Sequence, residues 1–294
     1  MLMDSSAQRF SYLPGAIVPG RSAETVNALL PPPINRELSL LEFNRRVLAL
    51  AENPETPLLE RLRFLCIVGS NLDEFFEIRI AGLKEQLRAK VLPAGLAPHE
   101  ARELFLQVGT EARVLIADQY RVLNEQVLPD LELAGVRLVR RTEFTAAQKA
   151  WVARFFAREV RPLLTPVGLD PSHPFPQVVN KSLNFAIQLS GQDAFGRDTG
   201  NAIVKAPRVL PRIIKLPQEV SGGAHDFVML SSVIHAHLHE LFPGREVVNY
   251  SQFRVTRDSD LWIDEEEVKN LRQALQGELT QRQFGSAVSN PKSV

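Results

Sequence analysis

Apolar side chains recur every three or four positions between residues 34 and 135, which is the spacing of helices that each bury one face. Ser39 and Glu42 have the spacing of a capping box, so we expect the first helix to begin at Ser39. The predicted helices run from Ser39 to Asn53, from Pro57 to a break at Gly69, from Asp73 to Ala89, and from His99 to about Leu131. Four helices with short connections predict an antiparallel up-down bundle.

Beyond Val136 the pattern changes to short β-rich runs and helical runs that do not alternate strictly, which is typical of an α+β domain. Strands are predicted over residues 136–139, 184–189, 202–204, 213–216, 227–230 and 252–256, and helices from Thr145 to Arg161, from Ser232 to Phe242 and from Asp264 to Gln283. The predicted fold is therefore an N-terminal helical bundle domain over residues 34–135 and an α+β head domain over residues 136–285. A flexible extension that ends in a proline run is expected over residues 1–33, and a polar tail over residues 286–294.

Charge divides along the same boundary. The 34 basic and 34 acidic residues give a net charge of zero, but residues 34–135 hold 12 basic and 16 acidic residues, whereas residues 136–294 hold 20 and 16. A neutral chain has no general attraction to nucleic acid, so we expect no nucleic-acid partner. We expect no transmembrane segment, because no run of eighteen apolar residues occurs, and peripheral membrane attachment stays open. The single cysteine, Cys66, excludes an internal disulfide and fits a reducing compartment.

Common nucleotide-binding and catalytic motifs are missing from the sequence. It has no G-x-x-x-x-G-K-[ST], no G-x-G-x-x-G after a strand, and no G-x-S-x-G. His235, His237 and His239 form an alternating run, but a helix would turn His237 away from the other two, and we expect no metal site there. The carboxylates from Asp264 to Glu267 are expected to mark the start of a helix, where negative charge complements the helix dipole.

The segment from Gly69 to Phe76 is the most informative in the sequence. Its residue types predict a tight corner between two helices, with Ser70 or Asn71 as the N-cap of the second. A functional alternative is that the corner presents the amide of Asn71 and helix N-terminal N–H groups to a ligand, because an amide both donates and accepts and so matches the edge of an adenine base. Phe75 and Phe76 are expected to lie in the core.

A second unusual segment, residues 171–184, combines a proline-stiffened loop with Lys181. Lys181 could meet a phosphate, and a structural loop that leads into a strand is the alternative. His173 has no partner base or carboxylate that the sequence can assign, so we do not expect a nucleophile there.

These motifs together resemble bacterial polyphosphate kinase of type 1. Three segments resemble the N-terminal part of that family: NRELSLLEFNRRVL from Asn35, PLLERLRFL from Pro57 and SNLDEFF from Ser70. Three further segments resemble the second domain of the family: HPFP from His173, NKSLN from Asn180 and FRVTRDSD from Phe253. The resemblance runs almost continuously from about Ile34 to Gly285, with the motifs in the order of the family.

The resemblance implies reversible transfer of the terminal phosphoryl group of ATP onto inorganic polyphosphate, through a phosphohistidine and with magnesium. It assigns the base contact of the ATP site to Asn71, and it assigns no catalytic or metal-binding residue to this chain, since those belong to two further C-terminal domains. It also implies ATP or ADP and polyphosphate as ligands and a homo-oligomer formed through the head domain. We expect a cytoplasmic location, with peripheral association with the inner membrane left open, and no kinase activity from this chain alone.

After Gly285 the sequence departs from the family pattern, so we expect the head domain to be incomplete in a truncated, frame-shifted or deliberately shortened product. Two alternatives to the N-terminal half of a kinase stay open. One is a non-catalytic module that dimerises or binds nucleotide or polyphosphate through the basic head, and the other is a non-functional truncated remnant.

Overall fold

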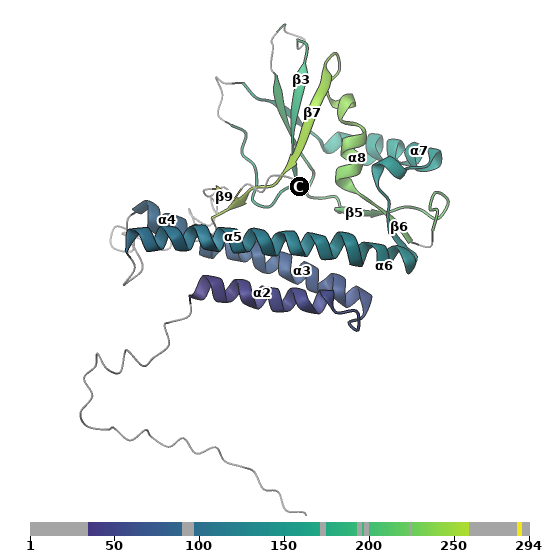
Figure 1. Cartoon of the computed structure of the whole chain (residues 1–294). Coiled ribbons are helices and arrows are strands. Elements are labelled where there is room, and N and C mark those ends of the chain that lie inside the picture. The colour runs from purple at the N-terminus through teal and green to yellow at the C-terminus, as the bar shows by residue number, and fades with distance from the viewer. Residues whose placement is uncertain are drawn as a thin grey trace, which may run out of the picture. The chain divides into compact units, whose positions relative to one another are not determined.

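The computed structural model describes residues 35–89, 97–170, 175–192, 196, 200–223, 225–258 and 287–289. Within this part of the chain, long helices come first and a head of short strands and helices follows, which confirms the predicted fold class (Figure 1). The described residues from Glu37 onward belong to one compact unit. The predicted extension over residues 1–33 and the predicted helix from Asp264 to Gln283 lie outside the described residues.

The described part of the bundle contains three long helices, whereas four were predicted (Figure 1). The first is α2 (Arg36–Glu52). The second is α3 (Leu58–Glu74), which continues through the π-helical segment η1 (Phe75–Ile80) into α4 (Ala81–Ala89); the third is α5 (Pro98–Val122), which continues through η2 (Leu123–Val127) into α6 (Leu128–Leu133). Short connections make neighbouring helices antiparallel, as predicted.

The bundle is held together by one cluster of buried apolar side chains. On each helix its members lie three, four or seven positions apart, which is the stripe that the sequence pattern predicted. The cluster includes Leu41 and Leu48 of α2, Leu65, Val68 and Leu72 of α3, Phe75 of η1, and Val108, Leu115 and Val122 of α5. The helices therefore pack through apolar faces, as expected for an amphipathic bundle.

The predicted corner at Gly69–Phe76 is wrong, because α3 passes through it without a break. Gly69 marks a close approach of two helices: a Cβ added there would lie 3.2 Å from Nε2 of Gln119 on α5. That amide nitrogen donates a 2.9 Å hydrogen bond to the backbone oxygen of Leu65, one turn before Gly69. The glycine therefore serves tertiary packing, which outweighs its low helix propensity.

The capping box predicted at Ser39 and Glu42 is also wrong. The helix already begins at Arg36, so Ser39 lies inside α2. Asn35 precedes the first helical residue, and asparagine is among the preferred N-cap residue types.

The head contains two sheets of three and four strands. The smaller sheet has the order β1-β6-β5, with β1 and β6 parallel, and the larger sheet is antiparallel with the order β2-β4-β3-β7. The strands are β1 (Val136–Leu138), β2 (Pro166–Gly168), β3 (Asn184–Ser190), β4 (Asn201–Lys205), β5 (Ile213–Lys215), β6 (His225–Met229) and β7 (Glu246–Phe253). All but β2 correspond to predicted strands, although β7 begins six residues earlier than expected.

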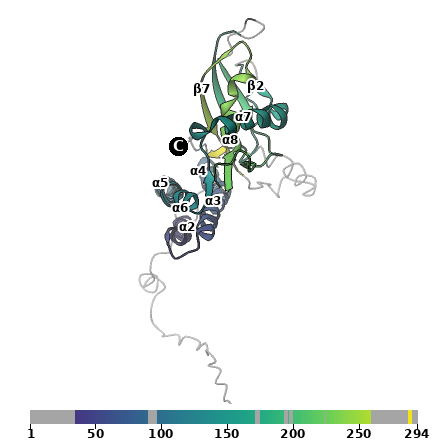
Figure 2. The same cartoon turned by 90° about the vertical axis from the view of Figure 1, so that its right-hand side faces the viewer.

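Helices of the head lie beside these strands in both views (Figure 1 and Figure 2). They are the 3₁₀ turn η3 (Arg141–Glu143), α7 (Ala146–Phe155) with η4 (Phe156–Val160) and η5 (Arg161–Leu163), and α8 (Leu230–Ala236) with η6 (Leu238–Leu241). The head core joins Phe156 of η4 and Ile234 of α8 to Phe185 and Ile187 of β3 and Val204 of β4.

A short third sheet pairs β8 (Thr256–Arg257) with β9 (Ala287–Ser289) in antiparallel register. The sequence pattern did not predict β9, because its three residues lie in a segment rich in polar and turn-forming types.

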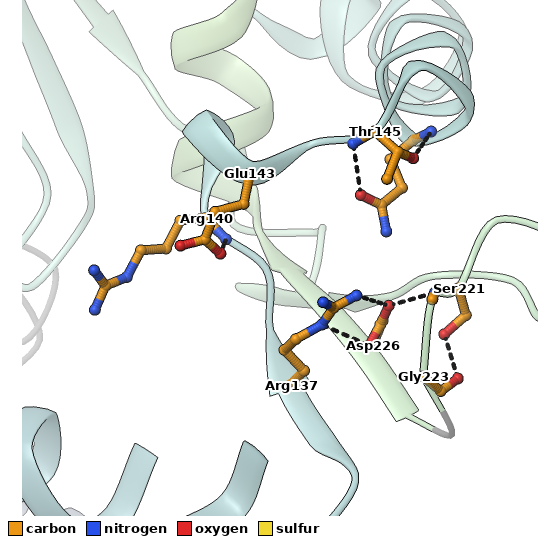
Figure 3. Close-up of polar contacts among 9 residues, drawn as sticks. Arg137, Arg140, Glu143, Thr145, Ser221, Gly223 and Asp226 are labelled. Carbon is orange, nitrogen blue, oxygen red and sulfur yellow. Dashed lines mark hydrogen bonds and ion pairs between the residues drawn. The ribbon is translucent and has the colours of Figure 1, made fainter. Parts of the chain in front are cut away.

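Thr145 caps α7 as predicted (Figure 3). Its hydroxyl accepts a 3.2 Å hydrogen bond from the backbone N–H of Gln148, and its own N–H donates to Oε1 of Gln148 at 3.0 Å. Replacing Thr145 with alanine is expected to lower the free energy of unfolding by about 1 kcal/mol, because one N–H at the helix start loses its acceptor. Urea titration measures this, and Thr145→Ser is the control, since serine keeps the acceptor. Equal stability of the two variants would contradict this account of the cap.

Candidate functional site

Asn71 lies in the last turn of α3, just before the helix continues into η1, and its partly buried side chain contacts α2. Its Nδ2 donates to Oδ1 of Asn44 at 2.9 Å, and Nδ2 of Asn44 donates to the backbone oxygen of Leu40 at 3.0 Å. Asn44 is only 3% exposed, so both ends of its amide are used inside the bundle. The chain Asn71–Asn44–Leu40 therefore fixes which way the Asn71 amide points.

The hydrogen bond to Asn44 uses one of the two N–H groups that an asparagine amide carries. The carbonyl oxygen of Asn71 and its second N–H lie outside that bond. They are one acceptor and one donor, the two kinds of group with which an asparagine amide pairs with an adenine edge. Presentation of helix N-terminal N–H groups beside Asn71 is ruled out, because Asn71 is not the N-cap that the sequence predicted.

Two carboxylates that follow Asn71 on the same helix reach the head. Asp73 is paired with Arg254, whose Nη2 lies 2.7 Å from Oδ1 and whose Nη1 lies 3.0 Å from Oδ2. A parallel pair of hydrogen bonds between guanidinium and carboxylate fixes direction as well as distance. This contact joins residues 181 positions apart in the sequence.

Glu77, four residues after Asp73, is buried at 8% exposure. Its carboxylate accepts from Nζ of Lys181 at 2.9 Å and from Nδ2 of Asn180 at 2.5 Å. Oδ1 of Asn180 accepts the backbone N–H of Arg257 at 3.0 Å, so one amide joins the helix to two segments of the head. Lys181 thus forms an ion pair with Glu77, and the alternative in which Lys181 meets a phosphate stays a hypothesis.

Three of the motifs noted in the sequence thus meet at one place. They are residues 70–76 with Glu77 immediately after them, residues 180–184, and residues 253–258. Sequence reasoning identified Asn71 and Lys181 but missed Asn44, Asp73 and Glu77. The available signal was the spacing of Asp73 and Glu77, which places two acidic residues on one face of a helix.

His235 and His237 of the alternating run each have a partner of their own. Nδ1 of His235 lies 2.8 Å from the hydroxyl of Tyr250, and burial, followed by the charge of Arg141, lowers the pKa of His235. Nδ1 of His237 lies 2.7 Å from Oε1 of Glu240. His235 and His239 line a shallow pocket of about 280 Å³ beside β7, together with Leu238, Val247, Val248, Asn249 and Tyr250. The histidines do not converge on one point.

Arg137 and Asp226 join β1 to β6 at the edge of the smaller sheet (Figure 3). Nη2 and Nε of Arg137 lie 2.8 and 3.2 Å from the two oxygens of Asp226, and the N–H of Gly222 donates to Oδ2 at 2.7 Å. The hydrogen bonds from Arg137 and then Gly222 hold the pKa of Asp226 below its usual value, although burial opposes them. This pair is structural and lies within the head.

Within the described residues, no group of three or more histidine, cysteine or acidic side chains could hold a metal ion. His173 and the carboxylates from Asp264 to Glu267 lie outside the described residues. No helix of the described part is long and apolar enough to cross a membrane.

Comparison with known families gives two adjoining matches. Residues 33–139 match the model of the polyphosphate kinase N-terminal domain, and residues 147–289 match that of the polyphosphate kinase middle domain. Together these ranges take in all the contacts described around Asn71, Asp73 and Glu77.

Individual relatives agree with the family matches. The chain is 55% identical to a polyphosphate kinase of Neisseria meningitidis over 256 residues, and 54% identical to that of Pseudomonas aeruginosa over 258 residues. These alignments cover 86% and 87% of this chain, but the chain spans only 37% of the length of either relative. A crystal structure of polyphosphate kinase from Porphyromonas gingivalis is similar with a TM-score of 0.66 and 27% identity, over 87% of this chain and 39% of that one.

Proposed function

Since this chain belongs to the polyphosphate kinase family and corresponds to its N-terminal and middle domains, we propose that it forms the adenine-side wall of an ATP site. The activity we propose for the intact protein is ATP:polyphosphate phosphotransfer, with ATP or ADP and inorganic polyphosphate as its ligands. The observation that carries the proposal is the oriented amide of Asn71, held by the 2.9 Å bond to buried Asn44.

Adenine presents an amino donor beside a ring-nitrogen acceptor, and an asparagine amide can pair with both. Guanine offers two acceptors on the corresponding edge, so the same amide pairs less well with it. Because Asn44 fixes the orientation of Asn71, the site is arranged before the nucleotide arrives. We therefore expect Asn71 to favour ATP and ADP over GTP and GDP.

The phosphoryl-transfer step needs a nucleophile and cationic groups around the phosphates. Resemblance to the family assigns the phosphohistidine and the magnesium and phosphate ligands to domains that do not align with this chain. Among the described residues, no cluster of histidine, cysteine or acidic side chains fits a metal ion. We propose that the chain alone transfers no phosphoryl group, and incubation with labelled ATP and magnesium checks this: a labelled chain or a growing polymer would overturn it.

We further propose that residues 34–135 and 136–285 act as the two domains of this half, with the homo-oligomer contact in the head. Analytical ultracentrifugation of the chain would test the oligomer contact, and a monomer at every accessible concentration would contradict it.

Asn71→Ala is expected to weaken binding of ADP or ATP by about tenfold or more, because a paired amide contact to a base contributes about 1–3 kcal/mol of discrimination. Isothermal titration of the whole chain measures this, with GDP as the comparison ligand. Asn124→Ala is the matched control, since it removes an exposed asparagine amide from η2.

Loss of adenine binding in Asn71→Ala alone would support a half-site for ATP. Equal binding by the wild-type chain and Asn71→Ala would contradict the role of Asn71. Absence of binding by either protein would favour a scaffold or a remnant.

A further inference from the structure

The helix that carries Asn71 is held to the head by two of the carboxylates that follow it, Asp73 and Glu77. We propose that these two side chains are positioning residues. With Asn180, Lys181 and Arg254 they form an ionic clamp that fixes the orientation of the Asn71 helix relative to the head. The inference rests on the function proposed for Asn71 and adds the device that places its amide.

Because Glu77 is buried, its carboxylate requires partners more strictly than that of Asp73. A carboxylate that leaves water without a partner is strongly disfavoured, so a helix that buries Glu77 must bring it to a cation and a donor. Lys181 and Asn180 supply these at 2.9 and 2.5 Å. A shift of the helix that broke both contacts would leave the carboxylate buried and unpaired, and this favours one position of the helix.

Asp73 adds direction to that position. Its two oxygens meet two nitrogens of one guanidinium, a geometry that constrains rotation as well as separation. Both Asp73 and Arg254 are partly exposed, so solvent screens this pair more than the pair at Glu77. We therefore expect Glu77 to contribute more to the clamp than Asp73.

The π-helical segment η1 lies where the clamp is made. It begins at Phe75, which is buried in the bundle core, and it includes Glu77, which is buried against the head. A π-turn fits an extra residue into the helical repeat and so changes the direction of the side chains that follow. Such turns occur frequently at functional sites, and this one coincides with the residues that contact both the bundle core and the head.

The head side of the clamp is also held by contacts within the head. The backbone N–H of Lys181 donates to the oxygen of Val255 at 2.9 Å, and Asn180 binds the N–H of Arg257 at 3.0 Å. Lys181 has a φ of 56°, in the left-handed region that a lysine rarely adopts. Surrounding contacts must maintain such a conformation, and it places the side chain of Lys181 on Glu77.

The experiment compares nucleotide affinity with the distance between bundle and head in the whole chain. Cys66 is exposed on α3 and takes one spin label, and Gln188→Cys, at an exposed position of β3, takes the other. Arg254→Asp places a like charge opposite Asp73, and the pair Asp73→Arg with Arg254→Asp restores opposite charges. Glu77→Gln keeps a hydrogen-bond acceptor but removes the charge, so it serves if the reversed variants fold poorly.

We expect Arg254→Asp and Glu77→Gln to broaden the distribution of label distances and to weaken ADP binding about fivefold or more, at the lower end of couplings between sites. The double variant with exchanged charges should recover at least part of the wild-type distance distribution and of the wild-type ADP affinity. Arg121→Ala is the control, because it breaks a pair with Glu52 inside the bundle and should change neither measurement.

Unchanged distance distributions in both clamp variants would overturn the clamp. Broadened distances with unchanged ADP affinity, in a chain where Asn71→Ala does lose binding, would remove the positioning role and leave the function of Asn71 intact. If the wild-type chain bound no adenine nucleotide, the proposed function would fail and the positioning role with it, while the distances would still decide whether the clamp exists.

Discussion

Replacing Asp226 with alanine is expected to lower the free energy of unfolding by about 3 kcal/mol, because it removes one partner of a buried ion pair. Asp226 is 1% exposed, and its carboxylate accepts from Arg137 and from the N–H of Gly222. Arg137 is partly exposed and can be hydrated in the variant, so the loss lies at the lower end of the range for buried pairs. Urea unfolding measures the change.

Glu159→Ala provides the control, since its contact with Arg158 is an exposed pair between neighbouring residues. Pairs of this kind contribute little to stability. A loss of similar size in the two variants would contradict a special role for Asp226.

The same pair predicts how stability depends on pH. The pKa of Asp226 is lower in the folded protein than in the unfolded chain, where it is about 3.9. Its contribution is therefore fully present above about pH 5 and is lost as the pH falls below the unfolded value towards the folded one. The difference in unfolding free energy between wild type and Asp226→Ala should shrink between pH 5 and pH 3. A constant difference over that range would count against this assignment.

Arg61→Ala is expected to cost about 2–3 kcal/mol, because one buried side chain joins all three long helices. Nε of Arg61 donates to the backbone oxygen of Ala51 in α2 at 2.7 Å, while its terminal nitrogens bind Asp130 at 2.8 Å and Gln126 at 2.9 Å. Removing it leaves the oxygen of Ala51 without this donor. The substitution also leaves a cavity beside α3, where the side chain of Arg61 was.

Arg61→Lys separates charge from geometry, because an ammonium group cannot reproduce a planar fork with three partners. We expect it to recover only part of the loss, measured by urea unfolding followed by circular dichroism. Full recovery by lysine would show that charge alone matters at this position.

Much of the fold could be predicted because local pattern and tertiary packing agree. The alternation of β3 and the helical stripe around Leu115 correspond to faces that are buried in the structure. Thr145 was found for the same reason, since its capping signal is local to one turn. The local sequence pattern and the structure disagree at Gly69 and Asn71, where turn-forming residue types lie inside a helix.

Such residues make tertiary contacts with partners that are distant in the sequence. Gly69 makes room for Gln119, Asn71 binds Asn44 across the bundle, and Asp73 binds Arg254. Each partner lies between 27 and 181 positions away, so no window of a few residues contains both members of a pair. Asn71 itself was singled out by its residue type and by a family resemblance, whereas the contacts that position it join residues far apart in the sequence.

The unbroken helix from α3 into η1 has a consequence for the kinds of sequence change that this region tolerates. An α-helix turns about 100° and rises about 1.5 Å for each residue. One residue inserted between Asn71 and Glu77 would therefore swing one side chain about a quarter-turn or more relative to the other, and a deletion would do the same in the opposite sense. The interval between these two positions acts as a phase constraint: its length must be kept, in addition to the residue types of Asp73 and Phe75, which make contacts of their own.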